Sequence, residues 1–90
     1  MGEFLFTIQE TFEFESIGLV VEADIKFKDA NLKNGDEIEL RLPGGLPLIT
    51  KVAGIAMFNP SNPERLFCFS LPKDLNKKDV PIGTEVWSHP

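Results

Sequence analysis

The stretch Leu19–Ile25, with the sequence LVVEADI, decides the fold class of this 90-residue chain. Its odd-numbered positions are all apolar, and two of its three even-numbered positions are the acidic residues Glu22 and Asp24. An alternation of period two is typical of a β-strand that turns one face to a core and the other to water. The stretch therefore predicts a half-buried strand, and the rest of the chain is interpreted around it.

The same alternation recurs along the chain and predicts further strands over residues 4–9, 12–15, 37–42, 48–58, 65–71 and 84–87. Asn34-Gly35-Asp36 and Pro43-Gly44-Gly45 favour turns, because glycine and asparagine tolerate positive φ. Gly54 predicts a bulge within the stretch 48–58, and residues 73–80 are expected to hold one helical turn. Six or so short strands separated by turns predict a single all-β domain over residues 1–90, a barrel or a sandwich.

The charge of the chain is unevenly distributed. Residues 1–25 hold six acidic residues and no Lys or Arg, although the whole chain has a net charge of only −5. A compact acidic domain repels phosphate backbones, so the composition argues against nucleic acid as a partner. The acidic stretch is interpreted as a solvated strand face, with a docking face for a basic partner as the alternative.

Several residues follow one another in an order that is typical of a known family. The pattern is Phe6-x-Ile8-x-x-x-Phe12-x-Phe14-x-x-x-Gly18-x-Val20-Val21, then Lys33-x-Gly35-Asp36-x-Ile38, Gly54-Ile55-x-Met57-Phe58 and Lys77-Lys78-Asp79-Val80-x-x-Gly83. From about Phe4 to Trp87 it resembles the β-barrel second domain of elongation factor Tu and other translation GTPases, present here as a stand-alone domain. The resemblance implies a closed six-stranded Greek-key barrel.

The residues shared with that family are expected to be structural. The apolar ones are candidate barrel filling: Phe6, Ile8, Phe12, Val20, Ile38 and Val86. The turn residues are expected where strands reverse and a Cβ would clash: Gly18, Gly35, Asp36, Gly54 and Gly83. The Asp36 carboxylate is expected to accept hydrogen bonds from backbone amides of its turn.

The departures from the family concern nucleic acid. In elongation factor Tu this domain helps to hold the aminoacylated 3′ end of tRNA, and the resemblance places a Glu and an Arg of the family at Ala56 and Asn59. A further Arg of the family falls at Ile17, within Ser16-Ile17-Gly18. A translation-associated role that contacts tRNA or the ribosome is therefore the second hypothesis, and protein binding is the first.

The residues that catalysis or cofactor binding would need are missing from the sequence. The chain has no phosphate-binding Gly-x-x-x-x-Gly-Lys-Ser/Thr loop for GTP, and one Cys with one His cannot form a zinc site. Cys68 lies in an apolar run and is expected to be a buried, unreactive thiol, and His89 is next to the last residue. A flavin-binding barrel is a further alternative, supported only by Arg65 and Phe67. We predict no enzyme, no cofactor, no metal and no catalytic residue.

The apolar residues outnumber those that a barrel interior can take. The run 66–71 is apolar on both faces, so an exposed patch is predicted that binds a protein partner or a second copy of the chain. Its candidate residues are Leu66, Cys68, Ile55, Met57 and Ile17. The alternative is that residues 59–63 and 73–80 fold over it. The chain opens with acidic residues and has no apolar stretch near 20 residues long, so a cytoplasmic location without membrane contact is expected.

Overall fold

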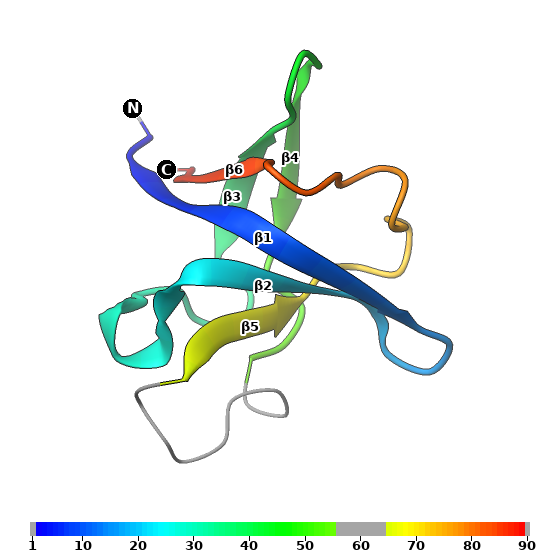
Figure 1. Cartoon of the computed structure of the whole chain (residues 1–90), viewed down its shortest axis with the longest axis horizontal. Helices are drawn as coiled ribbons and strands as arrows, with labels where there is room; N and C mark the ends of the chain where they lie inside the picture. The colour runs from blue at the N-terminus through cyan, green and yellow to red at the C-terminus, as the bar shows by residue number, and fades with distance from the viewer. Residues whose placement is uncertain (1, 56–64, 90) are drawn as a thin grey trace.

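The computed structural model describes residues 2–55 and 65–89 and forms one antiparallel sheet from them (Figure 1). In the described part the strands are β1 (Phe4–Phe14), β2 (Gly18–Lys26), β3 (Glu37–Arg41), β4 (Pro47–Lys51), β5 (Leu66–Ser70) and β6 (Glu85–Ser88). The 3-10 helix η1 (Phe27–Asp29) follows β2. The strand order is β4-β3-β6-β1-β2-β5, and every pair is antiparallel. The all-β prediction is confirmed.

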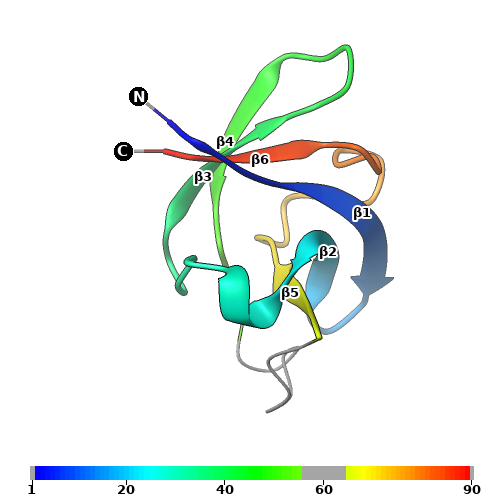
Figure 2. The ribbon, with the colours of Figure 1, turned by 60° about the vertical axis from the view of Figure 1, so that its left-hand side comes forward.

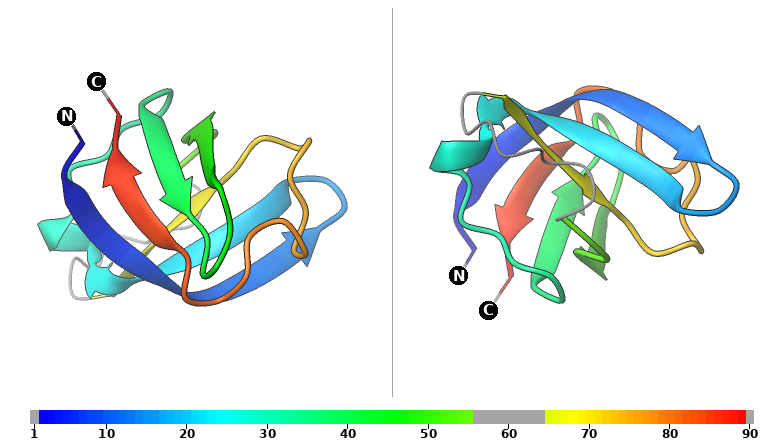
Figure 3. Two further views of the ribbon diagram at one scale, coloured as in Figure 1. Left: turned by 90° about the horizontal axis from the view of Figure 1, so that it is seen from above. Right: turned by 90° about the horizontal axis from the view of Figure 1, so that it is seen from below.

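The sheet curls strongly, so that its two end strands approach each other (Figures 2 and 3). The segment after β4 reaches the end of β5 through one bridge, in which Ala53 N donates to Ser70 O and Ser70 N donates to Gly54 O, each at 2.9 Å. No ladder joins β4 to β5 in residues 2–55 and 65–89. The structure is therefore one six-stranded sheet, and its closure into a barrel stays a prediction.

The concave face of the sheet carries the core. One cluster of thirteen buried apolar side chains draws on β1, β2, β3, β5, β6 and the connecting segments. The Phe6 ring lies at its centre, edge-on to Phe67 and Phe69, with ring centroids 5.8 and 5.9 Å apart. Of the predicted filling residues, Phe6, Ile8, Ile38 and Val86 belong to this cluster. Val20 is buried as well, but it lies outside the cluster.

The prediction that Phe12 fills the interior is wrong, because β1 contains a bulge. The pairing of β1 with β2 shifts between Ile8 and Glu10. A bulge adds one residue, so every later side chain of the strand changes face. Thr11 is consequently buried opposite Val21, whereas Phe12 is 42% exposed. A second shift between Phe4 and Phe6 turns Phe4 outward against Trp87.

Other boundaries differ from the prediction for similar local reasons. The two predicted stretches 4–9 and 12–15 are one bent strand, β1, and the predicted strand 48–58 stops at Lys51, with residues 56–58 outside the described residues. Gly54 forms the isolated bridge to Ser70 in place of a bulge within a strand. Residues 73–80 form turns and no helix. In one of these turns Asp79 N donates to Asn76 O at 2.9 Å.

Of the predicted turn residues, Gly18, Gly35, Asp36 and Gly83 lie where strands or loops reverse, whereas Gly54 forms a bridge. Gly18, Gly35 and Gly83 have φ of 97°, 88° and 98°, a region that side chains with a Cβ rarely adopt. Asp36 Oδ2 accepts a hydrogen bond of 2.9 Å from Lys33 N, as expected for this turn. These turns fix the β1–β2 connection and the loop before β3.

Candidate functional site

The convex face of the sheet carries a row of side chains that crosses four strands. Successive register pairs join Ile49 on β4 to Glu39 on β3, Glu39 to Trp87 on β6, and Trp87 to Phe4 on β1. The neighbouring residues Ile38, Leu40 and Val86 are buried in the core. Since successive side chains of a strand point to opposite faces, the row points away from the core.

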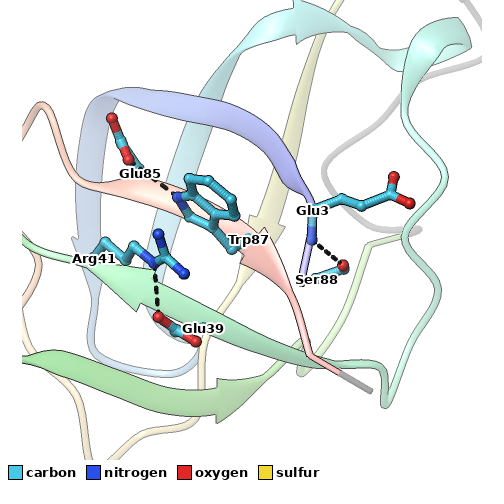
Figure 4. A network of polar contacts seen from close by, with 6 residues as sticks. All are labelled: Glu3, Glu39, Arg41, Glu85, Trp87 and Ser88. Carbon is cyan, nitrogen blue, oxygen red and sulfur yellow. Dashed lines mark hydrogen bonds and ion pairs between the residues drawn. The ribbon is translucent and has the colours of Figure 1, made fainter. Parts of the chain in front are cut away.

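The centre of this row is held by specific contacts (Figure 4). The guanidinium carbon of Arg41 lies 3.7 Å from the centroid of the Trp87 ring, and Arg41 Nε donates to Glu39 Oε2 at 2.7 Å. Trp87 Nε1 donates to Glu85 Oε1 at 3.0 Å. The Phe4 ring lies edge-on to Trp87, with centroids 5.6 Å apart and an interplanar angle of 67°. We call the set Phe4, Glu39, Arg41, Ile49, Glu85 and Trp87 the Trp87 face.

The contacts within the Trp87 face contribute little to the free energy of unfolding. Their main effect is to restrict the conformations of the side chains. An exposed cation–π pair contributes about 0.5–1 kcal/mol, and an ion pair at the surface about 0–1 kcal/mol. Together they restrict the rotamers of Arg41 and Trp87 before any partner arrives, which lowers the entropy that binding would cost.

The Trp87 face combines exposed apolar side chains with an arginine and two glutamates. Phe4 is 50% exposed and Ile49 is 47% exposed. They are two of seven large apolar side chains that are exposed among the described residues. Aromatic residues and Arg are enriched where protein interfaces carry most of their binding energy. The sequence analysis missed this site, although the alternation of Trp87 with the predicted core residue Val86 already places Trp87 on the outer face.

The predicted patch residues are spread over the molecule. Leu66 lies at the exposed start of β5 opposite Lys26, and Ile17 lies in the turn before β2. The two ends of β2 separate them by roughly nine strand residues, about 30 Å at the usual strand rise. The structure therefore does not bring Ile17 beside Leu66. Ile55 is half-buried against the core, Met57 is outside the described residues, and the patch as a binding surface stays a prediction.

Cys68 is half-buried on β5 and faces a carboxylate, which differs from the fully buried thiol that was expected. Its Sγ donates a long contact of 3.9 Å to Glu22 Oε2. Burial, followed by the Glu22 charge and this contact, raises the pKa of the Cys68 thiol from its ordinary 9.0 to about 11. Because the thiolate is the nucleophile, the Cys68 side chain is expected to react more slowly near neutral pH than an ordinary cysteine.

The Cys68 environment gives a first testable prediction. At pH 8 the shifted pKa leaves ~100-fold less thiolate than an ordinary cysteine, so modification by a disulfide reagent is expected to be slower by a similar factor than in the urea-unfolded chain. Glu22→Gln removes the charge and retains the burial, so it is expected to speed the reaction of the folded protein only partly. Equal rates in the folded and unfolded chain contradict this account.

In the described part of the chain, no three His, Cys, Asp or Glu side chains gather closely enough to hold a metal ion. None of its helices has the length and apolar character needed to cross a bilayer.

Fold and surface together define an all-β protein with one curled, six-stranded antiparallel sheet and an ordered aromatic cluster on its convex face. The chain matches no family model, and no significant match to it is found among curated proteins or among solved structures. A function is therefore inferred from the residues of this chain.

Proposed function

We propose that this chain is a non-catalytic β-barrel binding module that acts by contacting another protein through the Trp87 face. The observation that carries the proposal is the stack of Phe4, Trp87 and Arg41, which is ordered and accessible at the same time. Such a stack presents a large amphipathic surface at low conformational cost. The barrel is part of the proposal, and the bridge between Gly54 and Ser70 supports it by linking the two ends of the sheet.

The charges of the Trp87 face favour protein over nucleic acid as the partner. Glu39 and Glu85 flank the aromatic rings, and Glu39 Oε2 is already bonded to Arg41 Nε. The one guanidinium of the face is therefore neutralised locally, and a phosphate backbone would meet two carboxylates. A role that contacts tRNA or the ribosome remains the alternative. The cross-linking experiment below distinguishes the two roles by whether the cross-linked product contains protein or RNA.

Photo-crosslinking in the native cell tests the proposal. A photoreactive phenylalanine analogue at Phe4 is expected to give a discrete cross-linked protein that mass spectrometry identifies. The matched control places the same analogue at Phe14, which is on the same strand with a similar exposure of 47% against 50%. A cross-link from Phe14 but not from Phe4 contradicts the proposal, and a nuclease-sensitive product at Phe4 favours the RNA alternative.

A further inference from the structure

A groove of about 480 Å³ lies beside the start of β1 and the end of β6. Figure 2 shows these two strand ends side by side. One wall comes from the start of β1 and the end of β6, and the other from η1 and the loop that leads into β3. The side chains Leu5, Ile25 and Leu32 line it and pack against the core. A volume of this order is typical of sites that take several ligand side chains or one small molecule.

Backbone contacts fix both walls of the groove. On one side Glu3 N donates to Ser88 Oγ and Ser88 N donates to Glu3 O, each at 2.8 Å. Residue 2 is glycine, and a Cβ there would overlap the Ser88 carbonyl oxygen, so the strands can approach this closely only without one. On the other side, Gly35 N donates to Val52 O at 2.8 Å. These hydrogen bonds hold the segments that form the two walls of the groove in place.

The charge lining the groove is of one sign. Four carboxylates from three segments line it: Glu3, Asp29, Asp36 and Glu37. Among the described residues that line it there is neither Lys nor Arg, and His89 is the remaining ionisable group of the lining. Lys28 and Lys33 are next to the lining residues Asp29 and Leu32 in the sequence but do not line the groove. Carboxylates around low-dielectric walls concentrate positive charge and repel anions. A matching ligand combines positive charge with apolar surface.

We infer that this groove binds a segment of a protein partner that carries Lys or Arg beside aliphatic residues. A Lys or Arg side chain can lay its methylene stem on apolar surface while its charged end stays in water at an acidic rim. Phe4 is one of the residues that line the groove, and its ring contacts Trp87. The groove and the Trp87 face are therefore adjacent, and one partner can cover both. The inference rests on the proposed function for the identity of the ligand as a protein.

Peptide titration of the ¹⁵N-labelled full chain by NMR tests the inference with defined probes. The capped peptide Lys-Leu-Lys-Leu-Lys at millimolar concentration is expected to shift the amide signals of residues 3–6 and 29–37. The capped peptides Glu-Leu-Glu-Leu-Glu and Lys-Ser-Lys-Ser-Lys are expected to leave them nearly unchanged, because each lacks one of the two features. No shift with the first peptide, or equal shifts with the lysine–serine peptide, overturns the inference.

Charge reversal provides the matched variants. Glu3→Lys with Glu37→Lys is expected to weaken binding of the lysine–leucine peptide by at least about tenfold. Glu10→Lys with Glu15→Lys changes the net charge equally on β1 and the turn that follows it, and is expected to change the affinity less than about twofold. Equal losses in both variants overturn the inference. Arg41→Ala changes the Trp87 face at a residue that does not line the groove. It is expected to retain peptide binding, so failure of the groove and failure of the Trp87 face are separable.

Discussion

Replacing Phe6 with alanine is expected to lower the free energy of unfolding by about 3–5 kcal/mol. The Phe6 side chain is 2% exposed and makes edge contacts with both Phe67 and Phe69. Its removal leaves a cavity lined by rings that the sheet backbone holds in place. The free energy of unfolding of small domains is about 5–15 kcal/mol in total, so this one substitution removes a large part of it. Urea unfolding followed by Trp87 fluorescence measures it.

Phe12→Ala is the matched control, and it is expected to cost about 1 kcal/mol or less. Phe6 and Phe12 are residues of the same type on the same strand. They are an even number of residues apart, so in a regular strand both would lie on one face. The bulge after Ile8 separates them, so that Phe12 is exposed on the opposite face. Equal losses from the two substitutions would mean that β1 has no bulge and that the faces assigned here are wrong.

The sequence was sufficient for the parts of the fold that depend on local pattern. Alternation located the strands around Leu19–Ile25 and Glu37–Arg41, and Asn34-Gly35 located a turn with positive φ. The residues Ile8, Ile38 and Val86 were expected as core filling from the resemblance to the translation-factor domain, and they are buried in the core. The strands and the turn depend on residues that are close together in the sequence. A single sequence is therefore enough to predict them.

The bulges and the candidate site could not be predicted in this way. A bulge depends on how β1 pairs simultaneously with β2 and β6, and its residues Leu5 and Gln9 have no distinctive local pattern. The Trp87 face assembles residues from four strands, so it exists only once the strand order is known. The groove is likewise lined by both Glu3 and Glu37. These residues are far apart in the sequence, and no pattern in it indicates that they lie close together.

Replacing Trp87 with alanine is expected to weaken the complex with the cross-linked partner by at least about 30-fold, equivalent to about 2 kcal/mol. Trp87 is the residue that both Phe4 and Arg41 contact, so its loss disorders the whole stack. The same change is expected to cost the free protein only about 1 kcal/mol of stability, because the ring is half-buried outside the core. Circular dichroism checks that the variant remains folded.

The most direct test of the central claim is the dissociation constant of the partner identified from Phe4, measured by calorimetry for three proteins. Wild type and Phe14→Ala are expected to bind with the same affinity within about twofold, since Phe14 lies at the other end of β1. Trp87→Ala is expected to bind at least about 30-fold more weakly while remaining folded. Unchanged affinity for folded Trp87→Ala, or a comparable loss for Phe14→Ala, would contradict the assignment of the Trp87 face as the binding surface.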